Sequence, residues 1–201
     1  MRRKTDVGLR QTKKDQTRSQ LVEAAFTLIE KQGFQQTTIN EIAAAVNVSP
    51  RTFLRYFPTK DDVVVGWLDF IMAVLPSTLA QGSADEPIAD ALMRSARAMV
   101  GTYQTRGSFL NKIEDIITTS PTLQMRKQQR IEALVEDVSD ALAGVYGTRY
   151  SPLALDLYAG VAVSLCRAAI REWIRTGGQE EILAILDGAA GKVNMRLISD
   201  E

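Results

Sequence analysis

Hydrophobic residues recur every three or four positions along nearly the whole chain, which is the spacing of amphipathic helices. In residues 17–31, for example, Leu21, Ala25 and Leu28 share one face, and Gly33 follows as a left-handed helix cap. No segment keeps the two-residue alternation of a strand. We therefore expect an all-α chain of about nine helices. The expected ranges are 17–31, 38–46, 50–57, 60–79, 87–104, 108–118, 121–143, 152–176 and 180–198.

The stretch 38–57 predicts two short helices joined by a tight turn. Thr38 is a good N-cap, and Glu41 follows three residues later, as in a capping box. Asn47 tolerates the left-handed conformation that ends helices. Ser49 is a second N-cap, and Pro50 lies at the first helical position, where a missing N–H costs nothing.

The second of these helices, 50–57, is too short to be stable alone. Phe53 and Phe57, four residues apart, predict the face that packs against the rest of the protein. The other side carries Arg51, Thr52, Arg55 and Tyr56. A short, rigidly held helix with such a face is suited to the major groove of DNA.

Residues 17–65 resemble the helix-turn-helix signature of the TetR family of transcriptional regulators. The matching positions are Thr37, Thr38, Ile39, Glu41, Ile42, Ala43, Val46, Val48, Ser49, Thr52, Phe53, Tyr56, Phe57 and Lys60. The resemblance implies an N-terminal three-helix DNA-binding domain followed by a C-terminal helical ligand-binding and dimerisation domain. The alternative is a helical hairpin in an ordinary helical protein.

On that resemblance we expect Arg51, Thr52 and Arg55 to contact base edges, since an arginine can bridge two acceptors of guanine. We expect Thr38, Tyr56 and Lys60 to contact phosphates. The alternative for each arginine is a solvated surface charge. The full expected DNA-binding set is Thr38, Ser49, Pro50, Arg51, Thr52, Arg55, Tyr56 and Lys60.

The net charge is zero, but it is unevenly distributed. Residues 1–60 hold 11 Lys and Arg against 5 Asp and Glu, and residues 61–201 hold 13 against 19. A basic N-terminal third suits a nucleic-acid contact at one end only. We expect a disordered basic arm over 1–16, the DNA-binding domain over 17–65, and the ligand-binding and dimerisation domain over 66–201. The arm is alternatively only a solvated tail.

Residue usage argues against several other functions. The chain has no histidine and one cysteine, so a zinc site is not expected, and Cys166 lies in an apolar run that predicts a buried thiol. Acidic residues occur as adjacent pairs, which do not face each other on a helix. No nucleophile elbow, P-loop or dinucleotide fingerprint is present. We expect no enzyme activity, no metal and no cofactor.

The last two helices predict contacts with two partners, because 180–198 carries two apolar stripes. One stripe is bulky and the other is made of small residues, which let backbones approach closely. The resemblance likewise implies dimerisation through these two helices. The alternative is that the small residues only ease packing within the chain. The expected interface residues are Leu155, Ala159, Ala162, Val163, Ala184, Gly188 and Gly191.

The middle helices predict an apolar cavity with a few polar groups, and the resemblance implies an effector site there. For any single residue the alternative is an ordinary place in the core. The expected lining is Met93, Met99, Tyr103, Phe109, Ile113, Ile117, Leu134, Tyr158 and Trp173. The stretch 169–173 and the two glycines after it are similar to those of actinobacterial-type members of this family, some of which answer to acyl-CoA-like or other lipophilic ligands.

We therefore predict a homodimeric regulator that binds a pseudo-palindromic operator in double-stranded DNA and is released by a small lipophilic effector, which makes it a repressor. A transcriptional activator, or a helical protein-binding scaffold without ligand response, is the alternative. No apolar run approaches the ~18 residues of a membrane span, and the N-terminus has no apolar signal segment. We expect a cytoplasmic protein that does not bind membranes.

Overall fold

The structure is a computed structural model that describes residues 3–104 and 107–193, with side chains described for 13–104 and 110–193. These residues form helices and no strands, as predicted. The chain divides into two units, Met1–Trp67 and Leu68–Glu201. The division lies two residues from the expected domain boundary.

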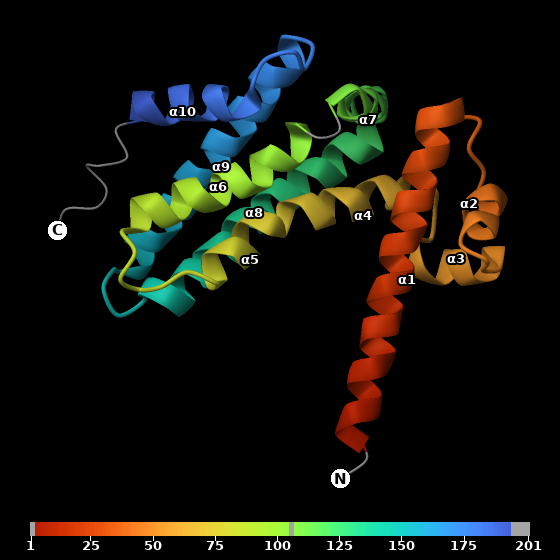
Figure 1. Ribbon diagram of the computed structural model, residues 1–201, viewed down its shortest axis with the longest axis horizontal. Coiled ribbons are helices and arrows are strands. Elements are labelled where there is room, and N and C mark those ends of the chain that lie inside the picture. Colours follow the sequence, from red (N-terminus) through yellow and green to blue (C-terminus); the bar gives the residue numbers. More distant parts are fainter. Residues whose placement is uncertain (1–2, 105–106, 194–201) are drawn as a thin grey trace. The chain divides into compact units, whose positions relative to one another are not determined.

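The first unit contains a long helix and two short ones (Figure 1). They are α1 (Arg3–Gln32), α2 (Ile39–Ala45) and α3 (Pro50–Tyr56), and α4 (Asp61–Met72) begins in this unit. The side chains of Leu21, Ala25, Ile42 and Phe53 are fully buried in its core. This is the three-helix arrangement that the apolar spacing predicted.

The expected disorder of residues 1–16 is wrong where the structure describes them, because α1 is helical from Arg3. The stretch 3–16 has no proline, and it is rich in lysine, arginine and glutamine, which are good helix formers. From the sequence we described this segment only as a basic arm. Here the polar segment instead extends a helix whose C-terminal part is packed.

The second unit contains α5 (Val74–Ala80), α6 (Ile88–Gln104), α7 (Gly107–Thr119), α8 (Pro121–Tyr146), α9 (Pro152–Arg175) and α10 (Ile182–Val193). α8 packs against α5 and α9, and α6 packs against α5, α9 and α10 (Figure 1). Ser120 and Ser151 cap α8 and α9, and each is followed by a proline at the first helical position. Both helix starts were predicted from this pair of residues.

The segment 60–79, expected as one helix, is divided at Ala73 into α4 and α5. Pro76 lies in the first turn of α5. It has no N–H to donate to the carbonyl of Met72, four residues earlier, and its ring crowds that carbonyl. The structure therefore has ten helical segments in its described part, or nine if this broken pair is taken as one.

Two helical stretches, 61–80 and 152–175, are long and apolar enough to cross a membrane by length and composition alone. The first is interrupted at Ala73, and both supply buried side chains to the packed units, among them Leu75, Ala159 and Cys166. Core packing therefore accounts for part of their apolar character, since 50% of the first stretch and 39% of the second are buried.

Candidate functional site

The short helix α3 is fixed at its start by local hydrogen bonds. The Ser49 hydroxyl accepts a hydrogen bond from the Thr52 backbone N–H at 3.1 Å, and Pro50 is the first helical residue. Asn47, with φ of 55°, makes the left-handed turn from α2, as predicted. At the start of α2, the Thr38 N–H donates to the Glu41 carboxylate at 2.8 Å, and the Glu41 N–H donates to the Thr38 hydroxyl at 3.2 Å. The predicted capping box is therefore formed.

Aromatic side chains form the buried face of α3. Phe53 and Phe57 are buried, with ring centres 5.7 Å apart. Gly66 of α4 lies so close that an added Cβ would be 2.8 Å from the Phe57 ring. The Arg18 guanidinium lies 5.1 Å from the centre of the same ring. A two-turn helix with no stability of its own is thus held by α1 and α4.

The side of α3 that remains exposed carries two arginines and one leucine. Arg51 and Arg55 are exposed, and the Arg55 guanidinium lies 5.4 Å from the Tyr56 ring centre. Leu54, which the sequence reading did not single out, is 46% exposed between them. The exposure of Leu54 could have been predicted, because Leu54 directly follows the packing residue Phe53 and adjacent residues do not share a helix face. Thr52 and Tyr56 are half-buried.

Lys60 contacts backbone carbonyls and an aromatic ring within its own unit, which the sequence did not suggest. Its ammonium donates hydrogen bonds to the carbonyls of Phe34 at 2.5 Å and Thr37 at 2.8 Å, and it lies 4.3 Å from the Phe34 ring centre. A third carbonyl, of Gln35, lies at 3.4 Å. Lys60 therefore fastens the loop that leads into α2. Its predicted phosphate contact stays a prediction, and it would compete with these bonds.

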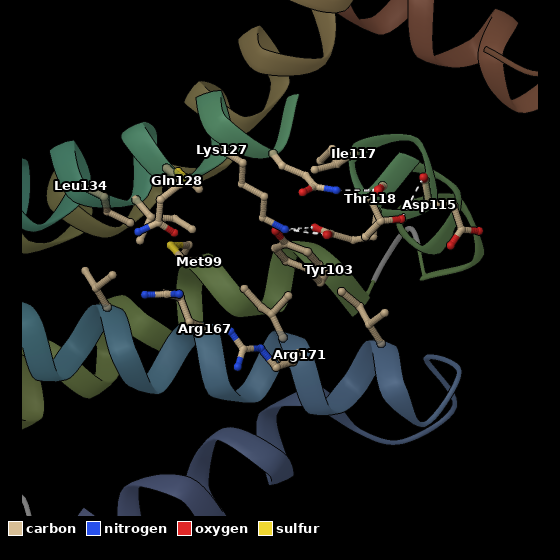
Figure 2. A pocket seen from close by; sticks show the side chains of 17 residues that line it. Met99, Tyr103, Asp115, Ile117, Thr118, Lys127, Gln128, Leu134, Arg167 and Arg171 are labelled. Atoms are coloured by element: carbon tan, nitrogen blue, oxygen red, sulfur yellow. Dashed lines mark hydrogen bonds and ion pairs between the residues drawn. The ribbon is translucent and has the colours of Figure 1, made fainter. Parts of the chain in front are cut away.

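The second unit contains a cavity of about 420 Å³ between α6, α7, α8 and α9 (Figure 2). Four of the predicted lining residues do line it, namely Met99, Tyr103, Ile117 and Leu134. Met72, the last residue of α4, lines it as well. The remaining wall comes from Glu114, Asp115, Thr118, Gln124, Lys127, Gln128, Ile131, Val163, Arg167, Ile170, Arg171 and Ile174.

The other five predicted lining residues do not line this cavity where the structure describes them. Met93, Ile113 and Tyr158 lie elsewhere in the unit, and the side chain of Phe109 falls outside the described residues. Trp173 is buried, and its indole N–H donates to the Glu180 carbonyl at 2.9 Å. It fixes the turn between α9 and α10.

That turn has a tight geometry around the Trp173 ring. Gly178, with φ of 71°, lies so near that an added Cβ would be 3.1 Å from the indole. The rings of Trp173 and Tyr103 also meet edge to face, with their centres 6.4 Å apart. Burial raises the pKa of the Tyr103 phenol well above its usual value, so this hydroxyl stays neutral beside the cavity.

The predicted dimer surface must be corrected on α9. Leu155, Ala159, Ala162 and Val163 are buried within the chain, and Val163 lines the cavity. Since they already pack inside, these residues cannot present a surface to a second copy. The α10 residues of the prediction, Ala184, Gly188 and Gly191, are exposed.

The opposite face of α9 is the exposed apolar one. Leu153 and Leu157 are 70% and 60% exposed. An outer groove of about 1090 Å³ runs between α9 and α10. Its lining is Asp156, Leu157, Gly160, Val161, Ser164, Leu165, Ala168, Glu172, Glu180, Ile185, Gly188, Ala189, Lys192 and Val193.

Comparisons with known proteins agree with this arrangement. Along its length the chain is 27% identical to the HTH-type transcriptional regulator TcmR of Streptomyces glaucescens, covering 96% of this chain and 89% of TcmR. A TetR-family regulator from Rhodococcus sp. has a similar fold, with TM-score 0.61, 16% identity, and coverage of 92% and 100%. Thermus thermophilus FadR, solved with lauroyl-CoA, matches with TM-score 0.54, 22% identity, and coverage of 90% and 92%.

Two family descriptions match successive parts of the chain. Residues 21–65 match "Bacterial regulatory proteins, tetR family", and residues 84–197 match "MftR C-terminal domain". The first match contains α2, α3 and their caps, and the second contains most of the helices around the cavity. These are families of transcription regulators and not of enzymes. The chain therefore belongs to the TetR family of helix-turn-helix, DNA-binding transcriptional regulators.

Proposed function

We propose that this protein is a cytoplasmic repressor that binds a pseudo-palindromic operator as a homodimer and leaves it when a small lipophilic molecule enters the cavity. The observation that carries the DNA-binding part is α3. It is capped by Ser49, supported by Phe53 and Phe57, and exposes two arginines and a leucine. A helix of this kind can enter the major groove with its side chains already ordered.

In this proposal Arg51 and Arg55 donate hydrogen bonds to guanine, which distinguish it from other bases by ~1–3 kcal/mol per contact. Leu54 lies between them and offers an apolar contact to the methyl group of thymine. Thr38 and Tyr56 contact phosphates.

A second copy of the chain would cover the outer face of α9 and α10. Leu153 and Leu157 are exposed on this face, and a large apolar patch in contact with water is unfavourable in free energy. Gly188 and Ala189 allow a helix of the partner to approach closely. Two-fold pairing would place two copies of α3 on one side of the duplex, where half-sites recur about every 34–36 Å.

The cavity supports the proposed response to a ligand. Its volume of about 420 Å³ lies in the range of small-molecule sites. Met72 lines it from the end of α4, and the same helix begins in the DNA-binding unit. A ligand that prefers one position of α4 would shift the equilibrium between two states of the regulator. FadR with lauroyl-CoA shares the fold, and an acyl-CoA-like effector is the starting candidate.

The test is an operator-selection experiment with the full-length protein, followed by gel shift on the selected sequence and on the DNA upstream of its own gene. We expect a two-fold symmetric site, and loss of selectivity in Arg51→Ala with dimerisation retained. Arg175→Ala is the control, because Arg175 is a 69% exposed arginine that bonds Glu172 and belongs to the second unit. Selectivity unchanged in Arg51→Ala would refute the assigned readout, and increased transcription on binding would identify an activator.

A further inference from the structure

Two arginines of α9 are part of the cavity wall, and neither is among the lining residues expected from the sequence. Arg167 and Arg171 are four residues apart, so they lie on one face of the helix. Figure 2 shows the Arg167 guanidinium on the side of α9 that faces the cavity and the Arg171 guanidinium close to the α9 ribbon, and both residues line the cavity. Arg167 is half-buried and Arg171 is exposed, which places Arg171 at the opening.

The other cation of the wall is already neutralised. The Lys127 ammonium lies 2.6 Å and 2.5 Å from the two carboxylate oxygens of Glu114, and both side chains are largely shielded from water. The remaining acid of the wall, Asp115, is exposed on α7. Neither Arg167 nor Arg171 has an ion pair or hydrogen bond to another side chain within the described residues.

This arrangement is unfavourable while the cavity holds no anion. Like charges four residues apart on a helix repel each other. A half-buried guanidinium without an acceptor also loses part of its hydration. An anion placed between the two would relieve both costs. Guanidinium groups suit this role, since their donors match a carboxylate or phosphate in a bidentate geometry.

The rest of the wall is mostly apolar. Its apolar side chains include Met99, Ile131, Leu134, Val163, Ile170 and Ile174. We propose that the effector is an amphiphile with an acidic group, which binds Arg167 and Arg171 while its apolar body fills the space toward Met72 and Leu134. This proposal rests on the ligand response proposed above and names the chemical class of the ligand.

The test measures binding of matched probes to the full-length dimer by titration calorimetry. Dodecanoate and 2-naphthoate are compared with dodecanol and 2-naphthylmethanol, which have the same apolar bodies without the acid. Lauroyl-CoA is added to distinguish a free acid from one carried on a phosphate-bearing group. We expect at least one acid to bind about tenfold or more tightly than its uncharged counterpart, the lower range for charge-assisted hydrogen bonds.

The double variant Arg167→Gln/Arg171→Gln should remove this preference and leave the binding of the uncharged probes within about threefold, as expected for a contact to the acid alone. Arg175→Gln is the matched control on the same helix, and it should keep the preference. Operator binding without ligand should be unchanged in all three proteins, which separates this proposal from the DNA-binding function. If neither lauroyl-CoA nor any acid exceeds dodecanol and 2-naphthylmethanol in the wild type, or if the preference survives in the double variant, the proposal is wrong.

Discussion

Replacing Lys60 by methionine tests whether this residue holds the fold or contacts DNA. Methionine keeps the length and apolar stem of the side chain and removes the charge. The ammonium has two short hydrogen bonds, to the carbonyls of Phe34 and Thr37, and a ring contact with Phe34. Hydrogen bonds to charged groups contribute about 1.5–3 kcal/mol. The site is only half-buried and water can replace part of what is lost, so we expect a cost near the low end, about 2 kcal/mol.

The assay is native-state hydrogen exchange of the backbone amides of α2 and α3, which reports local opening. A loss of about 2 kcal/mol would make these amides exchange about 30-fold faster. Lys31→Met is the control, because Lys31 is an exposed lysine at the end of α1 in the same unit. Unchanged exchange in Lys60→Met would refute the structural role. If the salt dependence of operator binding then also fell by about 0.9 in its logarithmic slope, Lys60 would be a phosphate ligand.

Three further predictions follow from single side chains. Replacing the thymine opposite Leu54 by uracil should weaken operator binding roughly fourfold in the wild type and not in Leu54→Ala, since one buried methyl contributes about 0.8 kcal/mol; equal losses would contradict the contact. Cys166 is buried and its pKa is raised to about 12 by burial, so iodoacetamide at pH 8 should label it only on unfolding, and rapid labelling of the native protein would be inconsistent with this packing. Hydrogen bonds from Thr38 lower the pKa of the Glu41 carboxyl from its ordinary value of 4.5. The stabilisation of α2 by the ionised carboxylate should therefore be complete above pH 4.5 and disappear as the pH falls through the lowered pKa. Acid unfolding curves of Glu41→Gln should lack this loss of stability, and curves identical to those of the wild type would contradict the role of Glu41.

Local signals predicted the helix starts because each depends on a few neighbouring atoms. Thr38, Ser49, Ser120 and Ser151 all accept the capping hydrogen bond from a backbone N–H three residues later. The left-handed Asn47 belongs to the same class, since its conformation depends on its own side chain and the adjacent turn. Such features need no knowledge of the tertiary fold, which is why they could be taken from the sequence.

The cavity and the dimer surface could be predicted only in part, because both depend on which face of a helix meets which neighbour. Periodicity shows that Leu155 and Val163 are on an apolar face, but it does not show that this face is turned inward while Leu157 is turned outward. The arginines of the cavity did leave a signal. Arg167 and Arg171 are charges at helical spacing that directly follow the uncharged stretch 157–166 of α9, and a charge on such a helix face needs a compensating partner.

The break between α4 and α5 bears on the construction of chimeric regulators. A hybrid joined at Ala73 would inherit the native α4 with its last residues, Asp69 and Met72. In the native chain, the Asp69 carboxylate forms an ion pair at 2.7 Å with Arg130 of α8, and Met72 borders the cavity. A foreign sensor module would lack both the arginine that pairs with Asp69 and the cavity wall that Met72 borders. We therefore expect such a hybrid to bind its promoter but not to respond to the new inducer. An engineered biosensor on this scaffold should therefore keep Arg130 and the cavity wall around Met72 together with the junction at Ala73.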